Sequence, residues 1–283
     1  MAISREKESL AKVLAHEGGY SNNKRDPGGP TMKGVTQRVY DAYRKGKGQA
    51  TRSVKSISTD ELNEIYDRQY WDAVKGDQLP DGVDYVLFDG AVNSGPGRSI
   101  MFLQQALRPL YTGRIDGVMG IGTLTALKAV NDNDALIDRI CDARMNFLRH
   151  LSTFAVFGKG WSARVREVRA IGISWATGET PQAANFVDGA DAKAFAEDAK
   201  TAPSTAPADA AIGAGGSGLG VTGVLEGLRD QLSPLSYASE WITKIVVVLA
   251  LVSALLVIGG GAYRWWTNRK AKHLAEALGT AGF

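Results

Sequence analysis

Residues 16–30 read HEGGYSNNKRDPGGP, and this stretch interrupts a sequence whose neighbouring segments are typical of helices. The stretch contains two glycine pairs, two prolines and two carboxylates, Glu17 and Asp26. The apolar residues before Glu17 are spaced for one helical face, and Gly18-Gly19 predicts that the helix ends there with glycine in the left-handed conformation. Asp26 opens Asp-Pro-Gly-Gly, a turn that would aim the second carboxylate back at the first.

The position expected for Glu17 has a chemical consequence. The helix dipole places partial negative charge at the carboxyl end of a helix. That placement favours the protonated carboxyl group that a general acid requires. Taken alone, the signal is weak, because a Glu before Gly-Gly is usually a solvated helix end and Asp-Pro-Gly-Gly is usually only a turn. Glu17 is therefore a candidate acid whose reaction the local pattern leaves open.

The rest of the front part of the chain also predicts helices, so the expected fold class is mainly α. Ser58 and Glu61 have the spacing of a capping box. Residues 83–92 form an apolar helical run, and Pro96 suits the first turn of the helix that follows. Residues 20–36 are the segment compatible with a short β-hairpin.

Charge is distributed unevenly along the 283 residues. Residues 1–170 carry 25 basic and 20 acidic side chains, residues 171–240 carry 3 and 9, and residues 241–283 carry 5 and 1. The front part has no dense basic run, so we expect no nucleic-acid partner. The single cysteine, Cys141, permits no intramolecular disulfide and is expected to be a buried, inert thiol.

The C-terminal third has a different composition. Residues 181–240 are rich in Ala, Gly, Ser, Thr and Pro, which predicts a flexible linker. Ile245–Ala262 is an uncharged run of 18 residues, close to the length that crosses a bilayer. A lysine precedes it and three aromatic residues follow, as at membrane interfaces. We therefore expect a transmembrane helix at 242–263 and a basic tail at 264–283.

The charges beside this segment predict its orientation. The basic residues after it favour a cytoplasmic C-terminus under the positive-inside rule, with the front part outside the inner membrane. A tail-anchored protein whose front part stays in the cytoplasm until release remains the alternative, because long domains follow charge rules poorly. The N-terminus has no signal-peptide core.

Several motifs together resemble a known enzyme family. HEGGYSNNKRDPGGPTMKGVT, YDRQYWD and VLFDGAVNSGPGRSIMFLQQAL occur in an order that is similar to the family 108 muramidases of phages and bacterial secretion systems. GRIDGVMGIGTLTAL resembles the small peptidoglycan-binding domain that follows in that family. The likeness covers about residues 5–175. It implies a lysozyme-like helical catalytic domain at 5–95 and a helical peptidoglycan-binding domain at 96–180.

The resemblance also implies roles for individual residues. The family's catalytic Glu falls on Glu17, which would protonate the glycosidic oxygen between N-acetylmuramic acid and N-acetylglucosamine. A looser likeness to T4-type lysozymes makes Asp26 and Thr31 candidates for positioning water or stabilising the transition state. The candidates for substrate binding are Tyr20 and Trp71 as stacking aromatics, with Tyr40 as a weaker one, and Thr36 and Asn93 within the matching motifs.

Other routes for cutting peptidoglycan fit the sequence poorly. The chain has three His, and His16 and His150 in the front part lack the spacing of a zinc site, so no metal and no cofactor is expected. Both are expected as ordinary helix-terminal side chains. In the glycine-rich stretch of the second domain, Thr123 is expected to cap a helix.

Three functions remain open at this stage. The favoured one is a membrane-anchored muramidase, an endolysin acting on peptidoglycan strands in the periplasm, with a holin as a further candidate partner. The second is a lytic transglycosylase in which Glu17 acts alone. The third is a non-catalytic tether that binds the wall.

Overall fold

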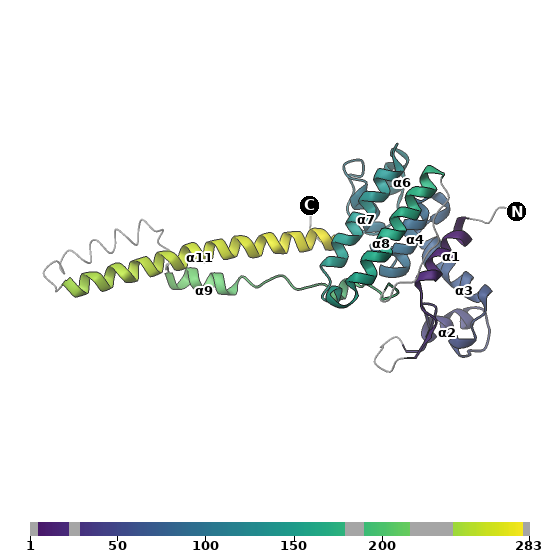
Figure 1. The fold of residues 1–283 in the computed structure, drawn as a ribbon, viewed down its shortest axis with the longest axis horizontal. Coiled ribbons are helices and arrows are strands. Elements are labelled where there is room, and N and C mark those ends of the chain that lie inside the picture. The colour runs from purple at the N-terminus through teal and green to yellow at the C-terminus, as the bar shows by residue number, and fades with distance from the viewer. Residues whose placement is uncertain (1–4, 23–28, 179–189, 216–239, 280–283) are drawn as a thin grey trace. The chain divides into compact units, whose positions relative to one another are not determined.

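The structure, a computed structural model of the chain, describes residues 5–22, 29–178, 190–215 and 240–279. It divides into two compact units, residues 1–200 with 277–283, and residues 201–276. Figure 1 shows the helices of the first unit, which are α1 (Arg5–His16), α2 (Gln37–Gly46), α3 (Thr59–Tyr66), α4 (Val83–Ser94), α5 (Pro96–Ala106), α6 (Ile121–Lys128), α7 (Asn133–Arg149) and α8 (Phe154–Thr177). The mainly α class predicted from the sequence is confirmed, and it is consistent with a lysozyme-like fold.

The local signals in the sequence account for several helix starts. The Ser58 hydroxyl accepts a hydrogen bond from the Glu61 backbone N–H (3.2 Å), and the Glu61 carboxylate accepts one from the Ser58 N–H (3.0 Å). This capping box starts α3, as predicted. Pro96 is the first residue of α5, where its missing N–H costs no helical hydrogen bond.

The predicted hairpin is present as a small antiparallel sheet. Its strands are β1 (Tyr20–Ser21), β2 (Thr31–Met32) and β3 (Val35–Thr36), in the order β1-β2-β3. Tyr20 pairs with Met32, and Thr31 lies between Ser21 on one side and Thr36 on the other. The sheet therefore follows α1 directly and folds back beside the residue at the end of that helix.

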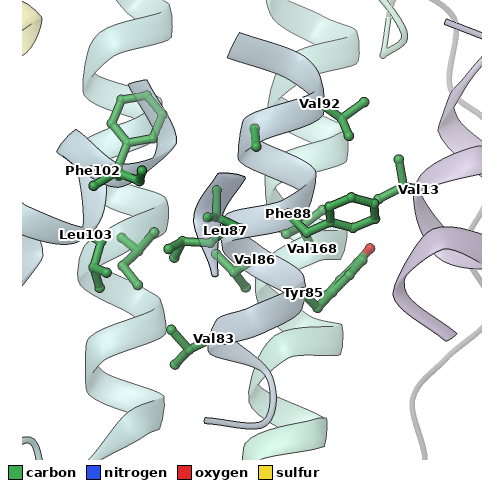
Figure 2. Packing of buried hydrophobic residues seen from close by; sticks show 14 of the residues in the cluster. Val13, Val83, Tyr85, Val86, Leu87, Phe88, Val92, Phe102, Leu103 and Val168 are labelled. Carbon is green, nitrogen blue, oxygen red and sulfur yellow. The ribbon is translucent and has the colours of Figure 1, made fainter. Parts of the chain in front are cut away.

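Helix α4 is the centre of the first unit, and all its residues are buried. It contacts α1, α5, α7 and α8. In Figure 2, Val13 of α1 faces Tyr85 and Phe88 on one side of α4, while Leu103 of α5 lies on the side of Leu87. The segments expected as two domains, 5–95 and 96–180, thus contribute to one hydrophobic core.

Two local expectations are wrong. Helix α6 begins after Gly120, and Thr123 is buried inside it, where its hydroxyl accepts a hydrogen bond from the Gln104 amide (3.2 Å). Neither Gly18 nor Gly19 is among the described glycines with positive φ, so α1 ends in a bend without a left-handed cap.

The second unit contains α9 (Ala206–Gly215) and most of α11 (Glu240–Leu278). Helix α9 lies close to Gly260 of α11. A Cβ on Gly260 would lie 3.1 Å from the Ala208 carbonyl oxygen and 3.4 Å from the Ala211 Cβ. The described part of the expected linker at 181–240 is therefore partly structured. Residues 216–239 lie outside the described chain.

The expectation of a transmembrane helix at 242–263 finds no support in the structure. Among the described residues, no helix combines enough length with enough apolar character to cross a bilayer. The side chains of residues 240–247, 249 and 250 are outside that description.

Gly82 is expected to be indispensable for the packing of α4 on α8. It precedes α4 with φ +82°, and a Cβ there would lie 2.1 Å from the Gly172 carbonyl oxygen. We expect Gly82→Ala to lower the unfolding free energy by about 3 kcal/mol, from backbone strain plus steric overlap. Gly48 has φ +68° with open space around it, so Gly48→Ala should cost only about 1 kcal/mol. If urea unfolding shows equal losses of unfolding free energy for Gly82→Ala and Gly48→Ala, this expectation is wrong.

Candidate active site

Glu17 lies directly after α1 with its side chain only 2% exposed. The Arg164 guanidinium from α8 contacts its Oε1 at 3.2 Å. The Lys193 ammonium, from a segment that follows α8, contacts both carboxylate oxygens at 2.9 and 3.0 Å. A buried carboxylate needs such partners. The site therefore combines the end of the first helix with two cations from much later in the chain.

The small sheet forms another side of the site. Gly34, in the turn between β2 and β3, has φ +75°, and a Cβ there would lie 2.7 Å from Glu17 Oε2 and 2.6 Å from the Tyr66 hydroxyl. Tyr66 donates a hydrogen bond to the Lys33 carbonyl oxygen (2.8 Å), which holds this turn in place. Only glycine leaves room for the turn to approach the carboxylate.

The pKa values of two tyrosines are raised at this site. Burial and the nearby Glu17 charge raise the pKa of Tyr66 well above its ordinary value. Burial and the same charge raise the pKa of Tyr70 to about 12. Both phenols are therefore neutral hydrogen-bond donors at neutral pH.

A buried ion network supports Arg164 from behind. Asp89 of α4 is fully buried and accepts contacts from Arg144 of α7 (2.7 Å) and from Arg164 of α8 (2.8 Å). Burial by itself would raise the pKa of Asp89, but Arg164 and Arg144 outweigh it and hold that pKa well below its usual range. Asp89 therefore remains ionised and fixes the arginine that reaches Glu17.

The other predicted catalytic residues are less closely connected to Glu17. Asp26 lies outside the described residues. Thr31 is half-buried in β2 and donates to the Gly29 carbonyl oxygen at 3.0 Å. Thr36 caps α2, because its hydroxyl accepts a hydrogen bond from the Val39 N–H (3.3 Å). No contact between either threonine and Glu17 occurs among the described interactions.

The aromatic candidates differ in exposure. Tyr20 is 41% exposed, as a stacking residue should be. The expectation for Trp71 is wrong: it is 2% exposed, packs edge-on against Phe88 and donates to Asp77. The weaker candidate Tyr40 is likewise buried, with its hydroxyl on Glu61. The apolar surface of these rings stabilises the core.

Asn93, at the end of α4, is buried beside the same late segment that carries Lys193. Its side-chain amide donates to the Ala192 carbonyl oxygen (2.8 Å), and its backbone carbonyl oxygen accepts from the Ala194 N–H (3.0 Å). The Trp161 indole N–H donates to the same Ala192 oxygen at 2.6 Å. The structure therefore brings Glu17 and Asn93 to one surface.

The sequence reasoning missed Arg164, Asp89, Arg144, Trp161 and Lys193. A signal existed for three of them. Asp89 interrupts an otherwise apolar run, and Arg144 and Arg164 occupy core-facing positions of their helices between buried apolar residues. A charge at a core position of an amphipathic helix predicts a buried partner. Nothing in the local composition pointed to Lys193.

The cysteine and the two histidines of the first unit form no second catalytic centre with other described residues. Burial raises the pKa of the Cys141 thiol to about 12, which fits an inert thiol. His150 caps the end of α7, and His16 ends α1 in a fully buried position. In the ranges that the structure describes, no group of three or more His, Cys, Asp or Glu could hold a metal ion.

The second segment carries an ordered glycine-rich loop. The Gln104 side chain accepts hydrogen bonds from the Asp116 and Gly117 N–H groups (both 3.0 Å), and its amide donates to the Asp116 carboxylate at 2.8 Å. These bonds fix the loop while Val118 and Ile121 remain 60% and 84% exposed. The loop thus presents apolar side chains to solvent on a rigid support.

Comparisons with known proteins agree with these features. The model of the family described as Glycosyl hydrolase 108 matches residues 10–95, and that described as Predicted Peptidoglycan domain matches residues 98–166. A solved structure, SagA of Brucella abortus, is 36% identical over 60% of this chain and 95% of its own, with a TM-score of 0.53. No curated protein matches the chain.

Motif order, the buried carboxyl group and these matches lead to one classification. The chain is a glycoside hydrolase that acts on peptidoglycan, a muramidase-type lysozyme. It belongs to the glycosyl hydrolase 108 family and carries the peptidoglycan-binding segment next to the hydrolase segment.

The Asp89 network should be essential for folding. Asp89→Asn would remove the carboxylate that buried Arg144 contacts and leave Arg164 with Glu17 as its partner. We therefore expect the unfolding free energy to fall by about 3–5 kcal/mol at pH 7. Because the pKa of Asp89 is depressed in the folded protein, its contribution is full above pH about 4 and declines as pH falls. The difference in unfolding free energy between Asp89→Asn and the wild type should therefore become smaller at acidic pH.

Asp142→Asn is the matched control for this experiment. Asp142 is 70% exposed and pairs with Arg169 across the same two helices, α7 and α8. An exposed pair contributes at most about 1 kcal/mol. Urea unfolding that finds similar losses for Asp89→Asn and Asp142→Asn would contradict the role given to the buried network.

Proposed function

We propose that Glu17 is the general acid that protonates the glycosidic oxygen between N-acetylmuramic acid and N-acetylglucosamine. The observation that carries this proposal is its placement: a buried carboxyl group at the end of α1, fixed by Arg164 and approached by the Gly34 turn. A glycosidase needs a positioned carboxylic acid within reach of the leaving oxygen. Among the described residues, Glu17 is the carboxyl group that the family's Glu-Gly-Gly-Tyr motif places there.

Two further residues, Asp26 and Thr31, are proposed to take part in the reaction. Asp26 and Thr31 would position a water molecule or stabilise the oxocarbenium-like transition state. Thr31 of β2 pairs with Ser21 of β1, and Ser21 follows Glu17 by four residues. This pairing supports a position of Thr31 near Glu17. Exposed Tyr20 would stack on a sugar face, and Thr36 and Asn93 would bind the substrate.

The glycine-rich loop of the second segment is proposed to hold the wall. Its exposed Val118 and Ile121 suit the apolar faces of sugars, and its backbone is fixed by Gln104. Binding through this loop would keep the glycan strand close to Glu17, since both segments share one core.

We further propose that the protein is held at the inner membrane and acts on periplasmic peptidoglycan, with a holin as a candidate partner. The support is the uncharged run Ile245–Ala262 and the aromatic residues after it. Along α11, Leu251, Leu255 and Ile258 are 60%, 69% and 65% exposed, so apolar surface is available for lipid.

Replacing Glu17 by Gln keeps the shape of the side chain but removes the proton that it donates. We expect turbidity loss of purified peptidoglycan to slow by about 10²–10⁴-fold, the usual contribution of a general acid. Glu8→Gln is the matched control in α1, the helix that precedes Glu17, where Glu8 forms a partly exposed pair with Arg5. Near wild-type lysis by Glu17→Gln would remove Glu17 from the mechanism.

The products identify the reaction. We expect mass spectrometry of digested peptidoglycan to show reducing ends, because a muramidase transfers the glycosyl group to water. Products with 1,6-anhydro ends would instead show a lytic transglycosylase, in which the sugar's own hydroxyl attacks.

Membrane attachment is tested by fractionation of cells that express the full chain. We expect the protein in the carbonate-washed membrane fraction, and protease added to intact spheroplasts should digest the front part. Replacing Leu251, Leu255 and Ile258 together by Ser should move the chain to the wash. A chain that is washed off without these changes would contradict membrane anchoring.

A further inference from the structure

Residues 190–200, which we call the strap, lie against the surface that carries Glu17 and Asn93. Beyond this surface the strap continues to the end of α7. There the Ser152 N–H donates to the Asp198 carbonyl oxygen (2.8 Å), and the Lys200 N–H donates to the His150 carbonyl oxygen (2.9 Å). The strap is therefore attached at both ends of its course.

The first part of the strap makes specific polar contacts with the candidate site. Its Ala192 carbonyl oxygen accepts from both Asn93 and Trp161, at 2.8 and 2.6 Å. Two residues later, the Ala194 N–H donates to the Asn93 carbonyl oxygen. A carbonyl oxygen and an N–H group are also what the acetamido group of an amino sugar presents. The strap thus satisfies groups that could bind such a sugar.

Lys193 lies between these two peptide contacts and covers the carboxyl group. Its ammonium nitrogen is within 3.0 Å of both Glu17 oxygens. Burial lowers the pKa of this ammonium, while the Glu17 charge opposes that shift. Close by, a Cβ on Gly18 would lie 3.3 Å from the Asp191 carboxylate, so the side chain of this strap residue lies near the backbone next to Glu17. With the strap in this position the Glu17 side chain is only 2% exposed, so the strap covers the carboxyl group that a substrate oxygen would have to reach.

We propose that the strap is an internal inhibitor that occupies the substrate position beside Glu17 and Asn93 and must leave before peptidoglycan binds. This inference rests on the proposed role of Glu17. The contact side chains, Ala190 and Ala194, are small, so burying them contributes little free energy. A strap held mainly by hydrogen bonds and one ion pair can be displaced by a substrate that replaces those contacts.

Proline substitutions in the full-length chain test the strap without changing the site. Ala194→Pro removes the N–H that donates to Asn93, and we expect it to speed turbidity loss of purified peptidoglycan about tenfold. Ala196→Pro is the matched control, since Ala196 is exposed at the start of a 3₁₀ turn and follows an extended residue. Its rate should equal that of the wild type.

A charge substitution provides a second, independent release. Lys193→Met removes the ammonium from Glu17 and should also raise the rate. Lys200→Met should not, because the Lys200 ammonium donates to the Arg149 carbonyl oxygen and not to Glu17. Rates for Ala194→Pro and Lys193→Met that equal their controls, or activity absent from all of them, would overturn the inhibitory role. Melting temperatures verify that each variant is folded.

The double variant Glu17→Gln/Ala194→Pro separates this inference from the proposed function. If Glu17 is the acid and the strap inhibits it, the double variant should lose the activity that Ala194→Pro gains. A double variant that keeps the raised rate would remove Glu17 from the mechanism while the strap still inhibits. If Ala194→Pro has the wild-type rate while Glu17→Gln is inactive, the inhibitory role of the strap is wrong and the role of Glu17 stands.

Discussion

The site depends on the ion network in which Asp89 lies between Arg144 and Arg164. Charges that are fully buried must be paired, so these three residues fix how α4, α7 and α8 pack. Because Arg164 also contacts Glu17, the position of the proposed acid is set by α8, a helix that follows it by more than a hundred residues. The peptidoglycan-binding segment, which ends at residue 166, thus contributes Arg164 to the candidate site.

The ion network fixes the position of Glu17 more than it stabilises the fold. Desolvating several charges is expensive, and apolar residues of similar volume often stabilise a core as well or better. A purely apolar contact, however, has no directional preference, whereas a guanidinium bound on two sides can lie in few orientations. Arg164 holds Asp89 with one part of its fork and Glu17 with another. The network therefore places a carboxyl group accurately at some energetic cost.

The sequence predicted what local physical rules determine. Glu17 after the first helix, the capping box at Ser58 and the start of α5 at Pro96 follow from backbone and side-chain groups only a few residues apart. It failed where distant segments decide. Trp71 looked like a sugar platform because an aromatic ring serves equally well in a core, and only burial distinguishes the two. Lys193 belongs to an alanine-rich stretch whose composition resembles a linker.

Glu17 is held by two cations, and their other contacts show that they differ in function. Arg164 cannot leave the carboxylate without abandoning Asp89 in the core, so it is a permanent part of the site. Lys193 has Glu17 as its ion-pair partner, and its side chain is 24% exposed, so it can return to water at little cost. One cation therefore positions the carboxyl group, and the other covers it reversibly. Both cations lie within 3.2 Å of Glu17, but only Arg164 also contacts the buried Asp89. For this reason Arg164 stays in the site, whereas Lys193 can leave it.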